Sequence, residues 1–197
     1  MAANLFVIEA PGKRQALAQA LRAAGVRDVL VLATIGHIGM NPQGFKPLAI
    51  DSVYRELAYR LKPDRERIAH EIEDEARAAK RIYLASDDDQ EGDVIARDVM
   101  RWCIPEEEQH KVLRVRLKSL APSEVRTALT GAQVFEAASA SRGDARRIVD
   151  RLIGSLSSDE GAVGRVQGSL LLELQSKTGQ QNLVDMFLQM IHDSKAA

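Results

Sequence analysis

An acidic segment at residues 86–93, Ser-Asp-Asp-Asp-Gln-Glu-Gly-Asp, is the feature of this sequence that points most plainly to chemistry. Carboxylates that crowd together repel one another unless a cation is bound. Oxygen ligands with no accompanying His or Cys favour Mg²⁺ or Mn²⁺. The alternative is an acidic helix N-terminus, which the helix dipole stabilises without any metal. The segment follows an apolar run, at the end of a predicted strand where α/β sheets bind ligands, and this position favours the metal.

A second group of polar residues follows the apolar run at residues 5–8, where Glu9 is succeeded by Ala-Pro-Gly and Lys13. The carboxyl ends of parallel strands meet at one edge of a sheet, so Glu9 is expected to face the acidic segment. Carboxylates held together bind a proton more tightly, as a general acid or base near neutral pH requires. Lys13 is placed to take a phosphate at a helix start. Taken separately, Glu9 is more typical of a solvated strand end, and Lys13 of a surface lysine.

The elements that must position these residues alternate between strand and helix. Short apolar runs predict strands, and apolar residues at helical spacing or charged segments between them predict helices. The predicted strands cover residues 5–8, 29–32, 82–85 and 112–117, and the predicted helices 17–24, 64–80, 92–102 and one beginning at Pro122. Strands that alternate with helices favour a parallel α/β sheet.

The pattern changes toward the end of the chain, and we place a domain boundary near residue 120, which gives domains 1–120 and 121–197. No β-prone run follows Gly131, and helices are predicted at about residues 134–153, 163–177 and 183–191. Irregular spacing with several prolines over residues 41–63 predicts an excursion from the sheet.

Composition limits the class of protein. Hydrophobic residues make up 45% of the 197-residue chain, enough for an ordinary core, and the net charge is −1. Residues 51–109 hold ten basic and seventeen acidic groups, a net −7, between flanks at 1–50 and 110–170 of +3 and +4. The single cysteine, Cys103, excludes an internal disulfide and is expected to be a buried, inert thiol. The first apolar run is too short for a signal peptide or a membrane span, so we expect a cytoplasmic protein.

Several motifs, in order, resemble those of type IA DNA topoisomerases. Residues 7–13 (Val-Ile-Glu-Ala-Pro-Gly-Lys), 36–38 (Gly-His-Ile) and 85–92 (Ala-Ser-Asp-Asp-Asp-Gln-Glu-Gly) are similar to the three parts of that family's Toprim signature. Residues 145–154 (Ala-Arg-Arg-Ile-Val-Asp-Arg-Leu-Ile-Gly) and 164–167 (Gly-Arg-Val-Gln) resemble the segments with which the family enters its DNA-binding domain. Five motifs in the family's order make chance agreement untenable.

The resemblance implies a Toprim fold, which is a Rossmann-like parallel sheet flanked by helices, followed here by an all-helical C-terminal segment. It implies that Asp87 and Asp89 are the main ligands of Mg²⁺ or Mn²⁺, with Glu91 and Glu9 completing the site. Glu9 would also shuttle the proton of a 3′-oxygen during an in-line phosphoryl transfer on DNA.

The same resemblance implies a set of contacts to single-stranded DNA. The residues that would meet its phosphates are Lys13, His37, Arg146, Arg147 and Arg165. On a helix, Arg147 also lies at pairing distance from Asp144 and Asp150, so an ion pair within the helix is the alternative for that residue.

Two departures from the family pattern bear on activity. Gln90 stands where the family has an arginine, which removes one positive charge beside the phosphate. The family's nucleophilic tyrosine motif does not occur: the tyrosines here are Tyr54, Tyr59 and Tyr83, and none lies in such a setting.

Several hypotheses follow. The first is an enzyme whose DNA cleavage needs a tyrosine from a partner chain, or which nicks DNA hydrolytically as Toprim nucleases do. The second is a non-catalytic DNA-binding or assembly module, and the third a truncated remnant of a longer gene. An apolar stripe in the last predicted helix, at Leu183, Phe187, Met190 and Ile191, is typical of core packing but also suits a homodimer or partner contact.

Overall fold

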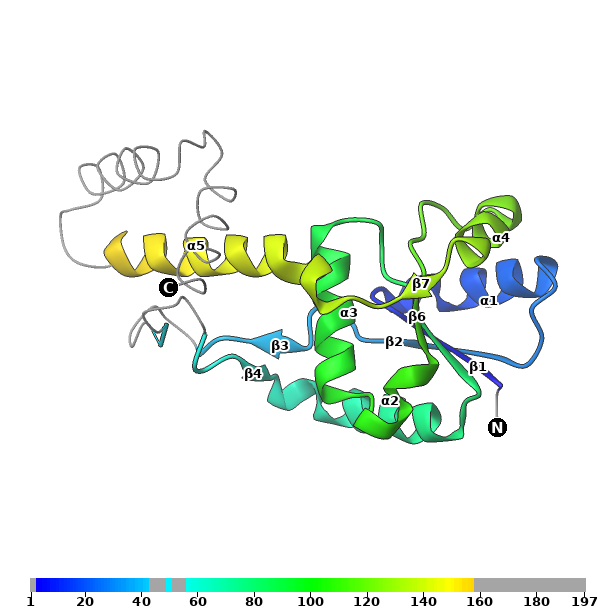
Figure 1. Cartoon of the computed structure of the whole chain (residues 1–197), viewed down its shortest axis with the longest axis horizontal. Helices are drawn as coiled ribbons and strands as arrows, with labels where there is room; N and C mark the ends of the chain where they lie inside the picture. Colours follow the sequence, from blue (N-terminus) through cyan, green and yellow to red (C-terminus); the bar gives the residue numbers. More distant parts are fainter. Residues whose placement is uncertain (1–2, 43–48, 51–55, 158–197) are drawn as a thin grey trace. The chain divides into compact units, whose positions relative to one another are not determined.

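The computed structural model describes residues 3–42, 49–50 and 56–157, drawn in colour in Figure 1. The chain divides into two compact units. The first comprises Met1–Met40 and Leu61–Ala140, and the second Asn41–Arg60 and Ser141–Ala197. The helices predicted at 163–177 and 183–191, with the apolar stripe on the latter, lie outside the described residues, as do Tyr54 and Arg165.

The first unit is built on a mainly parallel sheet. Within the described residues its five strands run in the order β2-β1-β5-β6-β7, in which β1–β2, β1–β5 and β5–β6 are parallel pairs and β6–β7 is antiparallel. The strands are β1 (Asn4–Ile8), β2 (Val29–Ala33), β5 (Arg81–Leu84), β6 (Val112–Arg114) and β7 (Gln133–Val134). The predicted parallel α/β sheet flanked by helices is therefore confirmed.

Helices cover both faces of this sheet, as Figure 1 shows. They are α1 (Arg14–Ala23), α2 (Glu66–Ala78), α3 (Gln90–Trp102) and α4 (Pro122–Thr130). The remaining short strands, β3 (Gly39–Met40) and β4 (Arg60–Leu61), pair with each other, and α5 (Ser141–Ser157) belongs to the second unit.

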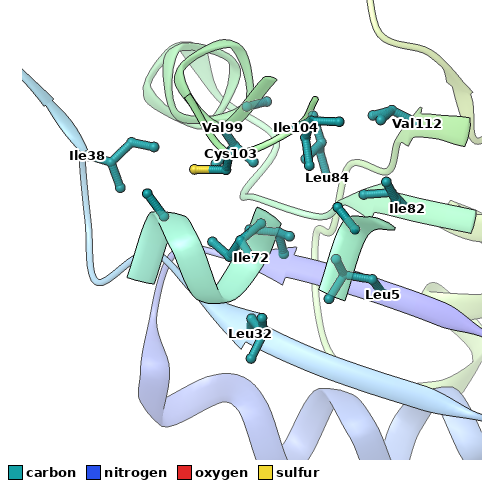
Figure 2. Close-up of a cluster of buried hydrophobic side chains, with 14 of the residues drawn as sticks. Leu5, Leu32, Ile38, Ile72, Ile82, Leu84, Val99, Cys103, Ile104 and Val112 are labelled. Atoms are coloured by element: carbon teal, nitrogen blue, oxygen red, sulfur yellow. The ribbon is translucent and has the colours of Figure 1, made fainter. Parts of the chain in front are cut away.

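The central strands are apolar on both faces because each face is covered. In β1, Leu5 and Val7 pack with α2 and α3, whereas Phe6 and Ile8 pack with α1 and α4. Strand side chains alternate between faces, so a continuous apolar run supplies two separate cores. Figure 2 shows the α2–α3 core, where Ile72 of α2 lies among side chains of the sheet and of α3. Phe6 stacks on Tyr83 in the other core, with ring centroids 4.4 Å apart.

Cys103 lies in the α2–α3 core and is 1% exposed, so the expectation of a buried thiol is confirmed. Burial, with smaller contributions from Asp98 and Glu73, raises the pKa of this thiol to about 12. The nucleophilic thiolate is therefore suppressed near neutral pH. Among the described residues, no helix combines the length and apolar character needed to cross a membrane.

The segment after Gly131 corrects the prediction of uninterrupted helix over residues 134–153. Gln133 and Val134 form β7, whose register places Val134 opposite Leu113 of β6. A 3-10 turn follows at Ala137–Ala140, and the helix begins only at Ser141. The exposed edge of β6 offers unpaired backbone groups, and their hydrogen bonds to β7 outweigh the local helical pattern.

Candidate active site at the sheet edge

The acidic segment forms the loop that joins β5 to α3, and its own side chains shape it. The buried Ser86 hydroxyl donates to the carbonyl of Gly92 at 2.7 Å. Asp89 is the N-cap of α3, because its Oδ1 accepts from the backbone N–H of Gly92 at 2.7 Å. An N-cap of this type contributes about 1 kcal/mol to helix stability. One of the two main predicted metal ligands therefore also begins the helix.

Gly92 allows the loop to close on itself. A Cβ atom at this position would lie 2.2 Å from the backbone oxygen of Asp87 and 3.1 Å from its carbonyl carbon. Both are backbone atoms that cannot rotate away. The first turn of α3 can therefore approach the loop this closely only with glycine.

Arg114, at the end of β6, packs against the acidic loop and is only 4% exposed. Its guanidinium donates to the backbone carbonyls of Leu84, Ser86, Val115 and Asp87, at 3.1, 3.0, 2.6 and 2.9 Å, and to Asp93 Oδ1 at 3.1 Å. A planar guanidinium with five donors suits such a set of acceptors, whereas a lysine does not. Arg114 therefore holds both the end of β5 and the start of the loop.

The charge of this buried arginine is balanced locally. Burial lowers the pKa of the Arg114 guanidinium, and the hydrogen bond to Asp93 offsets only part of that shift. Asp93 is itself 8% exposed and also accepts from Arg116 at 2.6 Å. Asp93 is thus a structural carboxylate, unlike the loop carboxylates that face the solvent.

An ion pair and a hydrogen bond connect the predicted site residues. Lys13 Nζ lies 2.9 Å from both carboxylate oxygens of Asp87, and His37 Nε2 lies 2.7 Å from Glu91 Oε2. Lys13 and Asp87 are each about half exposed, at 47% and 49%. The three motifs of the sequence, far apart along the chain, therefore meet at one edge of the sheet.

A cavity of about 570 Å³ opens at this edge. Its charged lining residues are Glu9, Lys13, Asp87, Asp88, Asp89 and Lys118. Glu9 is partly buried at the end of β1 and forms no ion pair with any residue that the structure describes. Glu91 and His37 do not line this cavity.

The donor chemistry of this lining fits a divalent cation, because four carboxylates supply the hard oxygen ligands that Mg²⁺ prefers. In the described part of the chain, however, no three Asp, Glu, His or Cys side chains converge on a point where an ion would sit. The reason lies in their partners, since Asp87 turns to Lys13, Asp89 caps α3 and Glu91 pairs with His37. A metal must therefore compete with protein contacts for at least one ligand.

The turn that carries His37 is strained. Ile35 has a φ of +59°, a left-handed conformation that β-branched residues rarely adopt, and its side chain is 51% exposed. The N–H groups of Ile35 and Gly36 donate to the backbone oxygen of Glu9, at 3.0 and 3.4 Å. These bonds fasten the turn to the end of β1 and impose the conformation.

Ile35→Asn is expected to raise the free energy of unfolding by about 1 kcal/mol, because asparagine tolerates the left-handed region at lower cost. The control is Ile35→Val, which keeps the β-branch and is expected to change the free energy by less than about 0.5 kcal/mol. Urea unfolding measures both variants. An asparagine variant no more stable than the valine variant would show that the turn is not strained.

The second unit contains the remaining predicted DNA contacts that the structure describes. Arg147 pairs with Glu56 and, at 2.9 Å, with Asp144, and it stacks 3.9 Å above the ring of Tyr59. Burial lowers the pKa of Arg147, but the hydrogen bond to Glu56 and neighbouring charges raise it above its usual value overall. Arg146, one position earlier on α5, is exposed. Phosphate contacts by Arg146 and Arg147 stay predictions, and the structure engages Arg147 in protein contacts.

Sequence reasoning missed Arg114 as a site residue. The alternation of apolar and basic residues over 112–117 predicted a strand and gave none of its basic residues a role. One signal was available, because a parallel strand buried by helices seldom carries an arginine unless a nearby group needs it. The neighbouring acidic loop is such a group.

Comparison with known proteins places this geometry among relatives. Residues 4–120 match the model of the Toprim domain family. The chain is 28% identical over 154 residues to DNA topoisomerase 1 of Campylobacter jejuni, which covers 78% of this chain and 21% of that protein. It is 27% identical over 168 residues to the plasmid DNA topoisomerase I of Xylella fastidiosa, covering 85% and 24%.

The fold also matches a solved structure, full-length topoisomerase I from Thermotoga maritima, with a TM-score of 0.65 and 22% identity. That match covers 89% of this chain and 31% of the other, and it shows the likeness of the fold. The chain thus spans between a fifth and a third of the length of these relatives.

Proposed function

This chain belongs to the Toprim domain family and is related to type IA topoisomerases, and from that premise we propose that its acidic cavity binds Mg²⁺ or Mn²⁺ and carries out phosphoryl transfer on DNA strands. The observation that supports this proposal most strongly is that four carboxylates line one and the same cavity: Glu9, Asp87, Asp88 and Asp89. Carboxylates gathered at the carboxyl edge of a parallel sheet suit metal-assisted chemistry on a ligand bound there.

The proposed roles follow from the cavity lining for Glu9, Lys13, Asp87 and Asp89. For Glu91 and His37, which do not line the cavity, they follow from the family resemblance. Asp87 and Asp89 are the main metal ligands, with Glu91 and Glu9 as supporting ones, and the bound cation would supply positive charge for a phosphate and an attacking oxygen. Glu9 is proposed to accept or return the proton of that oxygen, because it lines the cavity and no described residue forms an ion pair with it. Lys13 and His37 are proposed phosphate contacts.

The nucleophilic tyrosine is proposed to come from a partner chain. Tyr83 is 8% exposed and stacked on Phe6 inside the sheet. Tyr59 is 8% exposed and lies under the Arg147 guanidinium. Both tyrosines are therefore buried residues in the part of the chain that the structure describes.

A plasmid assay tests this proposal. Incubation of supercoiled plasmid with the purified chain and Mg²⁺ or Mn²⁺ is expected to give slow nicking that Glu9→Gln and Asp87→Asn abolish, without a ladder of relaxed topoisomers. Nicking that persists in both variants would contradict the assigned site. A topoisomer ladder with a protein-linked 5′ end, lost when Tyr54, Tyr59 or Tyr83 is changed to Phe, would contradict the partner tyrosine.

A non-catalytic DNA-binding module is the second candidate. It is favoured by the protein contacts that occupy Asp87 and Glu91, and by Gln90 at the start of α3. DNA binding that needs no divalent metal, together with no nicking by the wild type, would select this alternative.

Lys13→Gln is expected to tighten Mg²⁺ binding by roughly threefold to fivefold, because it removes a cation that competes for Asp87 through an exposed ion pair. The midpoint of the Mg²⁺ concentration that raises the melting temperature measures this change. Lys80→Gln, at the opposite end of β5, is the matched control and is expected to leave the midpoint unchanged. A midpoint that rises or stays the same in Lys13→Gln would show that the lysine does not oppose the cation.

A further inference from the structure

The acidic cavity must admit an anionic strand, and its lysines are not equally available. Lys13 is engaged by both oxygens of Asp87. Lys118, the other lysine of the lining, is exposed and forms no hydrogen bond or ion pair with any residue that the structure describes. Its charge is therefore available to a ligand.

Lys118 is the last of three basic residues that alternate with apolar ones as the chain leaves β6, and it lies at a bend. Val115 and Leu117, which lie between them, are buried in the core with α1 and α4. Alternation places Arg114 and Arg116 on the opposite side, and Lys118 follows at the bend. Along this series Arg114 is buried, Arg116 is half-buried and Lys118 is exposed.

The contacts that these three cations make with the protein decrease in the same order. Arg114 donates its hydrogen bonds to the end of β5 and to the acidic loop. Arg116 donates to Asp93 at 2.6 Å and lies 3.7 Å from Asp88. Arg114 and Arg116 thus hold the loop, whereas Lys118 is exposed to the solvent.

Lys118 also lines a second cavity, of about 330 Å³. Asp88 and Lys118 line both cavities, which are therefore neighbours. The second cavity has further hydrogen-bonding groups in Arg116, Thr127 and Gln133. A strand whose reacting phosphate lies in the acidic cavity would meet Lys118 as it passes into this neighbouring space.

We propose that Lys118 binds a backbone phosphate of the DNA strand next to the reacting one, and so directs the strand from the acidic cavity along the second cavity. The inference rests on the proposed function, since it assumes that a strand enters the acidic cavity. Lys118 is a positioning residue, and its effect is on binding.

Single-stranded oligonucleotide binding, followed by fluorescence polarisation of the full chain over a range of salt concentrations, tests this role. Lys118→Gln is expected to weaken binding by about twofold to fivefold, the range of one exposed ion pair. It should also reduce the slope of log affinity against log salt by roughly 0.7, the value for one phosphate of a single strand. Lys118→Arg should keep both the affinity and the slope, and Lys80→Gln controls for net charge.

The outcomes separate this inference from the proposed function. Wild-type affinity and slope in Lys118→Gln, with loss of binding in Lys13→Gln, would overturn the inference and leave the proposed function standing. A wild type that binds no oligonucleotide would overturn both. Loss of inorganic phosphate binding in Lys118→Gln, together with wild-type affinity and salt slope for the oligonucleotide, would assign Lys118 to a free phosphate ion and overturn the strand role.

Discussion

Gly92→Ala is expected to lower the free energy of unfolding by about 3 kcal/mol, because the added Cβ would lie 2.2 Å from the backbone oxygen of Asp87. To relieve this clash between the new Cβ and the Asp87 oxygen, the acidic loop and the first turn of α3 must move apart. That movement would disturb the bond from the Gly92 N–H to Asp89 that begins the helix. In an unconstrained helix the same substitution stabilises by up to about 1 kcal/mol, so even the sign of the effect is informative.

The matched control is Gly12→Ala, because a Cβ at Gly12 meets no atom within 4 Å and the residue lies next to Lys13 in the neighbouring motif. It is expected to change the free energy of unfolding by less than about 0.5 kcal/mol. Urea unfolding measures both variants. Equal stability of the two alanine variants would show that the loop does not approach α3 as closely as described.

Arg114→Met is expected to destabilise the fold by about 3 to 5 kcal/mol, the usual cost of removing one member of a buried ion pair. The substitution keeps the apolar length of the side chain but leaves the carbonyls of Ser86 and Asp87 without the donor they now share. Asp93 loses one of its two arginine partners. The acidic loop should therefore lose its shape before the rest of the sheet unfolds.

Arg116→Met serves as the control, since Arg116 is 38% exposed and its loss leaves Asp93 paired with Arg114. About 1 kcal/mol or less is expected. Thermal unfolding compares the two, and amide hydrogen exchange of residues 86–93 reports on the loop. Similar losses in both variants would mean that Arg114 is not the support of the loop.

The layout of the sheet could be predicted because its strands are buried on both faces. Residues 5–8 and 82–85 are apolar without interruption, as helix-covered parallel strands require, and polar residues begin where the strands end. The meeting of Glu9 with the acidic loop follows from that parallel register, in which Val7 lies beside Leu84. The apolar patterns of β1 and β5 therefore also predicted that the polar residues after the two strands lie close together.

The features that were not predicted depend on contacts between distant segments. The basic residues after Val112 are equally spaced in the sequence, yet Arg114 is buried and Lys118 is exposed. The difference arises because the acidic loop covers Arg114 and does not cover Lys118. The strand at Gln133–Val134 forms because β6 has an open edge, which is not visible in the local sequence. The engagement of Asp87 by Lys13 likewise arises from two residues 74 positions apart.

The most direct test of the proposed metal site is thermal unfolding in increasing Mg²⁺ or Mn²⁺. A cation that binds only the folded protein stabilises it by about 2.7 kcal/mol at a hundred times its dissociation constant. Asp87→Asn/Asp89→Asn removes two proposed ligands while asparagine at position 89 can still cap α3. Glu71→Gln/Asp74→Asn, on the exposed side of α2, removes the same charge elsewhere. We predict a metal-dependent rise in melting temperature for the wild type and the α2 variant that the Asp87/Asp89 variant loses, and equal rises in all three proteins would contradict a metal site in the acidic cavity.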